Sequence, residues 1–445
     1  MDRATHSNTT LLAQVLAMMI PLWLAGYWII YINQIELAKL VFRPGMLGLC
    51  CLQLFFWYRM PFTVAEKKLV ALLSLFCAAI LVTALAAADL STAMQEWIKL
   101  ALLCFTPLPV CRALRQNGVA RAFGIGCIAA SASVGAMIVL VYVRHMGLVW
   151  PGYTAVRVFK SVANDLGIPF NPISFICVVS YLCGMCLVRG NRWLYALGLL
   201  LVLISTILTG SRTPLATIVV SAVILLIMNA AKSRSPLTLA TGWLMVILLL
   251  AAPFVAAIQF SDLQLNDFTE HRWMLWQVGL EQFTGQPIFG NGSMSWYPAI
   301  SSAIPTGHLV AGAYHNEFVT ALAEHGTIGF IALCSLFAFL IHSAWKLAFS
   351  ASLTWECKQW ALFGALVIFM RALVEVPGLL GYSQEPADFF AYMFLAVVVS
   401  RFSAEEDFCR LSNRVARPHG QKFHAAFHRQ PALSRPMLRN SEYSH

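Results

Sequence analysis

The stretch "LVALLSLFCAAILVTALAAA", residues 69–88, runs for twenty residues without a charged side chain. An α-helix of about 20 residues is about 30 Å long, which matches the hydrocarbon thickness of a lipid bilayer. The rest of the chain has the same character, because 59% of its residues are hydrophobic and only 11% are charged. Its mean hydropathy of +0.72 excludes a soluble globular protein, in which apolar residues make up about 45–50%. The sequence therefore predicts a polytopic membrane protein.

Twelve apolar stretches are long enough to predict transmembrane helices. They lie near residues 9–33, 38–58, 69–88, 93–111, 122–143, 166–188, 192–210, 213–231, 235–257, 316–345, 358–377 and 386–402. These runs are continuous and lack the alternation of polar and apolar residues that transmembrane β-strands show. We therefore expect an all-α membrane protein of about 12 spans, whose transmembrane domain covers residues 1–402.

The distribution of Lys and Arg predicts the orientation of these spans, because basic short loops are retained in the cytoplasm. The even-numbered connections hold twelve Lys and Arg and the chain from Arg401 onward adds eight, whereas the odd-numbered connections hold nine. Both termini are therefore expected in the cytoplasm, and the long loop over residues 258–315 is expected on the outer face. The basic tail, residues 403–445, is predicted to be disordered and to touch anionic lipid headgroups.

Some cations are expected on the outer face, where the positive-inside tendency selects against them. They are Arg157, Lys160, Arg212, Arg272 and Arg371. A cation kept on this side near the end of a span usually faces an anion or a cavity. Arg157 and Lys160 also fit ordinary loop cations. Arg371 stands four residues before Glu375, so these two side chains also fit a pair that neutralises itself on one helix.

Arg212 is the hardest of these cations to explain as structural. It lies in the tight connection "LTGSRTPLA", residues 208–216, between two spans that carry no other charge. Thr209, Gly210 and Ser211 just before it offer two hydroxyl groups and a backbone that a ligand can approach closely. Arg212 is therefore a candidate anion-binding residue.

The long loop contains one predicted helix. Its apolar residues recur at intervals of three and four and would lie on the membrane interface: Trp273, Trp276, Leu280 and Phe283. Arg272 would begin this helix, and "TGQPIFGNGS", residues 284–293, would end it with turn-forming glycine, proline and asparagine. The glycine pair in this segment fits a plain turn, and it also fits backbone contact with a phosphate.

The stretch "AYHNEFVTALAEHGTIGF", residues 313–330, places two histidines and two glutamates at the start of a predicted span. Asn316 has the residue type of a helix N-cap, and the positive end of the helix dipole favours a neutral imidazole at His315. A neutral imidazole can accept a proton, so His315 is a candidate general base. A hydrogen-bonded interfacial role for His315 stays open at this point. His325 is expected to be structural.

These segments resemble motifs of the O-antigen ligase and polymerase superfamily. "YHNEFVTALAEHGTIGFIAL", residues 314–333, is similar to the His-Asn pair of that family and the Glu-x-Gly-x-x-Gly pattern that follows it. "TGSRTPL" at 209–215 resembles its Ser-Arg motif, and "FNPIS" at 170–174 resembles a segment that opens a span. "HRWMLWQVGLEQFTGQPIFGNGS" at 271–293 resembles its Arg-x-x-x-Trp helix and Pro-x-x-Gly-x-Gly turn. The resemblance covers roughly residues 155–335.

The resemblance implies a GT-C-like glycosyltransferase fold with one long periplasmic loop, in the bacterial inner membrane. Such enzymes transfer a glycan from undecaprenyl pyrophosphate to an acceptor at the periplasmic face. The acceptor is the lipid A-core oligosaccharide in the ligase branch, another carrier-linked repeat in the polymerase branch, and a protein in the O-oligosaccharyltransferase branch. The chain shows no periplasmic domain beyond the one loop, which favours the ligase branch.

The resemblance also implies catalysis without a metal or other cofactor, and no nucleic-acid partner is expected. When the sugar–phosphate bond breaks, the lipid pyrophosphate gains negative charge that fixed cations must then meet. The residues expected to bind the donor are Arg212, Arg272, Arg157, Lys160 and Asn316. Arg212 and Arg272 would also stabilise the transition state, and His315 would take the proton of the acceptor hydroxyl. Displacement in one step would invert the anomeric centre.

Two other classes of function fit the sequence less well than glycan transfer. A transporter or lipid-linked-sugar flippase should show internal repeats and ionisable groups at mid-membrane depth, whereas the polar signals of this chain gather at one face. A purely structural membrane partner would account for the amphipathic loop helix but not for the Arg and His motifs. Glycan transfer therefore fits the sequence best.

Overall fold

The computed structural model of the chain describes a set of segments that are helical or lie in turns and short connections. These are residues 3–31, 45, 48–49, 60–147, 158–159, 170–188, 192–209, 218–219, 223, 272–295, 299, 314–349, 355–373, 375, 379–380 and 388–404. None of these residues lies in a β-strand, which agrees with the predicted all-α class. The predicted tail lies outside them apart from its first two residues.

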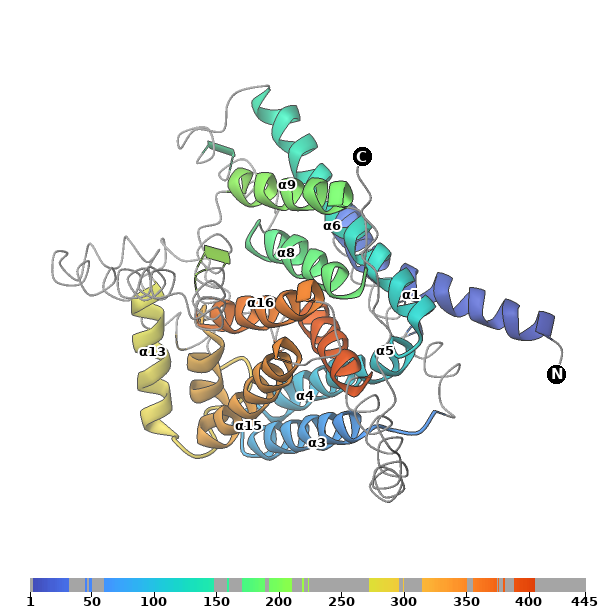
Figure 1. The fold of residues 1–445 in the computed structure, drawn as a ribbon. Coiled ribbons are helices and arrows are strands. Elements are labelled where there is room, and N and C mark those ends of the chain that lie inside the picture. The colour runs from blue at the N-terminus through green and yellow to red at the C-terminus, as the bar shows by residue number, and fades with distance from the viewer. Residues whose placement is uncertain are drawn as a thin grey trace, which may run out of the picture. The chain divides into compact units, whose positions relative to one another are not determined.

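The helices follow one another along the chain as Figure 1 shows. They are α1 (Arg3–Tyr31), α3 (Val64–Leu85), α4 (Leu90–Phe105), α5 (Pro107–Ala113), α6 (Asn117–Met146), α8 (Phe170–Leu187), α9 (Arg192–Leu208), α13 (Arg272–Gly285), α15 (Glu317–Ala348) and α16 (Trp355–Ala372). Residues 388–404 are also helical. Most of these helices coincide with predicted spans. The predicted spans 38–58, 213–231 and 235–257 lie almost entirely outside the described residues.

Three of the described helices are long and apolar enough to cross a membrane: α3, residues Gly118–Met146 of α6, and α15. Shorter apolar segments cover Leu11–Gly26, Pro172–Leu187, Gly198–Leu208 and Gln359–Ala372. This content agrees with a membrane protein. The count of about 12 spans and the GT-C-like fold stay predictions.

The predicted span 93–111 is divided in the structure. α4 ends at Phe105 and α5 begins at Pro107, with Thr106 between them. Pro107 has no N–H group to continue the hydrogen bonds of the preceding helix, and proline fits the first position of a new one. α4 alone has 16 residues and is therefore about 24 Å long, shorter than a typical span.

The helices pack into two groups that meet through α8 and α16. α6 packs against α1, α8 and α9, and α15 packs against α3, α13 and α16. A serine on each of α6 and α8 donates to a carbonyl of the other helix: Ser131 Oγ lies 2.8 Å from Cys177 O, and Ser180 Oγ lies 2.7 Å from Cys127 O. Such interhelical hydrogen bonds between small residues are typical of membrane helices.

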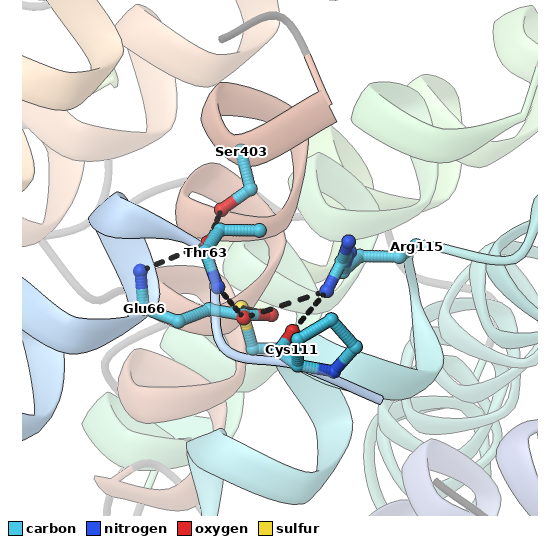
Figure 2. A network of polar contacts seen from close by, with 6 residues as sticks. Thr63, Glu66, Cys111, Arg115 and Ser403 are labelled. Atoms are coloured by element: carbon cyan, nitrogen blue, oxygen red, sulfur yellow. Dashed lines mark hydrogen bonds and ion pairs between the residues drawn. The ribbon is translucent and has the colours of Figure 1, made fainter. Parts of the chain in front are cut away.

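The helix at residues 388–404 lies in the core. Its side chains from Asp388 to Ser400 are all buried, so every face of this part of the helix is covered. Its last turn joins a polar cluster at the start of α3, where the Thr63 and Ser403 hydroxyls share a hydrogen bond of 2.8 Å (Figure 2).

The same cluster caps α3. The Thr63 hydroxyl accepts from the Glu66 backbone N–H at 3.1 Å, and the Glu66 carboxylate accepts from the Thr63 N–H at 2.7 Å. This reciprocal capping box satisfies two donors of the first helical turn. Arg115, just beyond α5, donates to Pro61 O at 2.9 Å and lies 3.6 Å from the Glu66 carboxylate (Figure 2). The start of α3, the end of α5 and the C-terminal helix are thereby held together.

Candidate functional site

The first helix of the site, α13, begins at Arg272 and ends at Gly285, as the sequence predicts. Its buried residues are Leu275, Val278 and Gly279. α13 packs against α15 (Figure 1), and Leu275 and Val278 share a buried cluster with Val319 and Ala323 in the first turns of α15. Of the predicted apolar stripe, Trp273 and Leu280 are exposed and Phe283 is half-buried, whereas the half-buried Trp276 packs against the buried cluster between α13 and α15. Trp273 and Leu280 therefore face the surroundings of the protein, and the placement of this helix on the membrane interface stays a prediction.

The helix opposite, α15, is interrupted at Gly326, whose φ of 60° and ψ of −161° are not helical. A helix break leaves backbone donors and acceptors without their usual partners, and such groups are costly within a membrane protein unless others replace them. The segment after α13 supplies the replacements. Thr327 N donates to Pro287 O at 2.8 Å and Ile328 N to Ile288 O at 3.4 Å.

The segment after α13 also donates hydrogen bonds to α15. Asn291 N donates to Ala323 O at 3.0 Å, and Gly292 N donates to Glu324 O at 2.9 Å. We call this pairing of residues 286–292 with the break in α15 the backbone clasp. It uses the amide of Gly292, and the amide of Gly290 donates within its own turn to Gln286 O at 2.9 Å. Of the two interpretations of the glycine pair, the structure favours a turn over contact with a phosphate.

The clasp requires glycine on both sides. A Cβ atom added at Gly290 would lie 2.4 Å from the backbone carbon of Glu324, and one added at Gly326 would lie 2.4 Å from Ile288 O. Both glycines also have positive φ angles, 71° and 60°. Any other residue would strain the backbone and push the two segments apart.

The start of α15 is built around Asn316. Its side-chain oxygen accepts from the backbone N–H groups of Phe318 at 2.9 Å and Val319 at 3.0 Å, which confirms the predicted N-cap. Its side-chain NH₂ group donates to Leu373 O at 2.7 Å, so the cap is also tied to the end of α16. Binding of the donor by Asn316 stays a prediction.

His315 stands directly before this cap in a rare backbone conformation. Its φ of 53° lies in the left-handed region, which few residues other than glycine adopt. Strained residues of this kind gather at functional sites, where the surrounding structure holds them in place. The His315 side chain is 29% exposed, so it is held by the protein and still open to a ligand.

Three segments meet at Glu375, which follows the end of α16. Its Oε1 atom lies 2.5 Å from Nη2 of Arg272, and its Oε2 atom lies 3.0 Å from Nδ1 of His315. Arg272 is the first residue of α13 and His315 precedes the N-cap of α15. The structure therefore brings together the two site residues that the sequence predicted in these segments, on a carboxylate that the prediction did not include.

The electrostatics of Glu375 follow from this placement. The carboxyl group is buried, with its side chain 3% exposed, and it lies against the permanently charged guanidinium of Arg272. A positive charge at this distance favours the ionised form of a carboxyl group. Glu375 is therefore a carboxylate at neutral pH.

The pairing predicted for Arg371 and Glu375 is only part of what the structure shows. The charge of Arg371 acts on Glu375, but its guanidinium carbon lies 3.9 Å from the ring centre of Phe175 in α8. The two oxygens of Glu375 also contact Arg272 and His315, which lie 103 and 60 positions earlier in the chain. A sequence spacing of four residues suggested the local pair, and no local signal could have found the distant partners.

His325 has the structural role that the sequence predicted. It is 1% exposed, and its Nδ1 atom lies 2.9 Å from the hydroxyl of Thr83 in α3. Thr83 donates its own hydrogen to Ile80 O at 2.8 Å, so its oxygen accepts from His325. The side chain of His325 thereby ties α15 to α3.

The remaining predicted site residues are Arg157, Lys160 and Arg212, and they lie outside the described residues. Their assignment to pyrophosphate binding stays a prediction. The segment at 170–174 does open a helix, because α8 begins at Phe170. Within the described parts of the chain, no group of three or more His, Cys, Asp or Glu side chains could hold a metal ion.

Comparison with known proteins supports part of this interpretation. Residues 197–334 match the family model described as O-Antigen ligase. The matched segment contains Arg212, Arg272, His315 and Asn316, and it supports the resemblance that the motifs indicate. No curated protein matches the chain.

Proposed function

We propose that this chain, which carries an O-antigen ligase segment over residues 197–334, transfers O-antigen glycan from undecaprenyl pyrophosphate to the lipid A-core oligosaccharide. The reaction would take place at the periplasmic face of the inner membrane and complete lipopolysaccharide. Both termini of the chain would then lie in the cytoplasm.

One observation carries the proposal. A permanently charged guanidinium and an imidazole, from Arg272 and His315, meet on one buried carboxylate although they lie far apart in the sequence. Transfer of a sugar from a lipid pyrophosphate needs these two chemistries side by side. A cation must receive the charge of the leaving group, and a base must receive the proton of the attacking hydroxyl.

The proposed reaction is a single displacement. The acceptor hydroxyl oxygen forms a bond to the anomeric carbon of the glycan while the bond from that carbon to the phosphate oxygen breaks. The hydroxyl proton passes to the imidazole of His315, and the electron pair of the broken bond leaves with undecaprenyl pyrophosphate. Attack opposite the leaving group inverts the anomeric centre.

Arg272 would meet the leaving group. A guanidinium presents several N–H donors in one plane and is always charged, which suits two phosphate oxygens at once. Arg212 would act with it, and Arg157, Lys160 and Asn316 would complete the donor site. The catalytic residues proposed here are His315, Arg212 and Arg272.

The lipids of cells that lack the protein test the proposal. We expect lipopolysaccharide that carries core alone, with full-length glycan accumulating on its carrier. Core that carries a single repeat would instead indicate a polymerase, and unchanged lipopolysaccharide with unglycosylated protein would indicate a protein O-oligosaccharyltransferase. Carrier-linked single repeats retained at the cytoplasmic face would indicate a flippase. Each of these three outcomes would overturn the ligase assignment.

A further inference from the structure

We propose that Glu375 is a positioning residue of this site, which sets the tautomer of His315 and orients Arg272 beside it. The inference rests on the proposed function for the reaction that the pair carries out. It adds a residue outside the segment that matches the ligase family.

The tautomer follows from counting hydrogens. An ionised carboxylate has no hydrogen and can only accept, so at a separation of 3.0 Å the Nδ1 atom of His315 must donate to Glu375. In the neutral ring only one nitrogen carries a hydrogen. Nε2 therefore holds the lone pair and is the nitrogen that takes the proton from the acceptor. Without Glu375, both tautomers would be available.

The orientation follows from how Glu375 is held. Its backbone N–H donates to Arg371 O at 2.8 Å, so the residue stays attached to the last turn of α16. Two positions earlier, the carbonyl of Leu373 accepts from the side chain of Asn316, the N-cap of α15. The carboxylate and the imidazole are therefore fixed from both sides by backbone contacts. With one carboxylate oxygen on His315, the other contacts Arg272.

Charged side chains from several segments surround the contact between Glu375 and His315. Glu375 faces His315 before α15, Arg272 in α13 and Arg371 in α16. The nearby Glu317 accepts from Leu380 N at 2.9 Å and is influenced by the charge of Arg371. The carboxylate of Glu375 is thus the anion that directly contacts the imidazole.

A contact of this kind stabilises the imidazolium that forms when the base takes a proton. An opposite charge within about 4–6 Å shifts a titration by about one to three pH units. A residue that merely filled space at this point would not move the titration of the ring. The pH at which His315 becomes protonated is therefore the property that distinguishes the two roles.

The experiment compares three variants of the full chain in lipid nanodiscs. Glu375→Gln removes the charge and keeps the shape, and Glu375→Asp keeps the charge. Glu66→Gln is the matched control, because Glu66 is also a buried carboxylate beside an arginine, Arg115, but belongs to the cap of α3. Thermal unfolding of each variant checks that the protein is folded.

The first measurement does not depend on transfer activity. Diethyl pyrocarbonate modifies neutral imidazoles, and peptide mass spectrometry at a series of pH values gives the midpoint of modification for His315. The exposed His145 serves as the internal reference. We expect Glu375→Gln to lower the His315 midpoint by about one unit or more, Glu375→Asp to restore most of it, and Glu66→Gln to leave it unchanged.

The second measurement is the rate of transfer against pH, with purified lipid-linked glycan and acceptor. We expect Glu375→Gln to lower kcat on the order of 10²-fold or more and to move the acidic limb to lower pH. If the modification midpoint stays in place, Glu375 does not position His315, whatever the transfer rate. If the midpoint of His315 modification shifts as expected in the variants but the wild-type protein transfers glycan to no acceptor, the proposed function is overturned. The role of Glu375 then stands.

Discussion

His315 shows how a single residue of a candidate site can combine a strained backbone with a paired side chain. A left-handed backbone costs a non-glycine residue on the order of 1–3 kcal/mol, and the cap at Asn316 and the carboxylate of Glu375 hold it from either side. A substitution at this position therefore tests two properties, the side chain and the backbone. Asparagine tolerates the left-handed region better than alanine does.

The first prediction uses this difference. His315→Asn should abolish transfer while preserving thermal stability and binding of the carrier-linked donor, because the backbone is kept and the base is lost. Purified protein in liposomes, supplied with donor and acceptor, gives the rate. His325→Ala is the comparison: it should lower the melting temperature through the lost bond to Thr83 and affect kcat far less. Parental turnover of His315→Asn would remove the base assignment.

The second prediction concerns Arg272. Arg272→Ala should lower kcat/KM on the order of 10²-fold or more, which corresponds to about 3 kcal/mol of lost transition-state stabilisation. Arg272→Lys should recover little, because lysine is a point charge that cannot contact both the carboxylate of Glu375 and a phosphate in one plane. Steady-state kinetics with varied donor checks this. A lysine variant as fast as the parent would show that charge alone is sufficient.

At the scale of elements, the backbone clasp holds the segment after α13 against the break in α15. α13 and α15 pack against each other at their facing sides, and four backbone hydrogen bonds join the break in α15 to the segment after α13. Arg272 and His315 both lie at the beginnings of these helices, so a shift of either helix would separate them.

The third prediction tests the clasp. Gly326→Ala and Gly290→Ala should each lower the apparent melting temperature in detergent and reduce transfer, because the new Cβ would lie 2.4 Å from backbone atoms of the partner segment. Strain of this kind costs on the order of 1–3 kcal/mol or more. Gly285→Ala is the matched control, since a Cβ at Gly285 meets nothing within 4 Å. Equal stability of all three variants would show that the clasp contributes nothing.

Local sequence signals predicted some features of these elements and missed others. The extent of α13 and the cap at Asn316 follow from residues close together in the sequence, and both are confirmed. The break at Gly326 was not predicted, because glycines in an apolar run also indicate close helix packing. Only the partner segment at residues 286–292 makes the break possible. Glu375 was missed for the same reason, since its partners lie far away along the chain.

At the scale of the whole molecule, α3 makes buried polar contacts near both of its ends. His325 contacts α3 at Thr83, near its end, whereas the cluster of Thr63, Glu66 and Ser403 lies at its start. Glu66 and Thr83 are about 25 Å apart along the helix axis, close to the thickness of the hydrocarbon core. The long apolar runs were sufficient to predict such helices. The division of the predicted span 93–111 depended on a single proline.

The fourth prediction concerns orientation. Cysteines introduced singly at Thr284, at the end of α13, and at Lys68, in the first turns of α3, are both at exposed positions. A membrane-impermeant maleimide applied to intact spheroplasts should label Thr284→Cys and not Lys68→Cys, and permeabilised cells should label both. The parent protein measures the background from native cysteines. Labelling of Lys68→Cys alone would reverse the orientation and move the site to the cytoplasm.

The broken helix α15 has a consequence for biogenesis. Until residues 286–292 are in place, the carbonyls of Ala323 and Glu324 and the amides of Thr327 and Ile328 lack the partners seen in the clasp. Each such group left unpaired in hydrocarbon costs several kcal/mol. The ribosome completes the clasp segment before α15, so that segment can be translocated first and receive the helix as it enters the bilayer. In a circular permutation that reversed this order, α15 would be synthesised before the segment that supplies its hydrogen-bond partners.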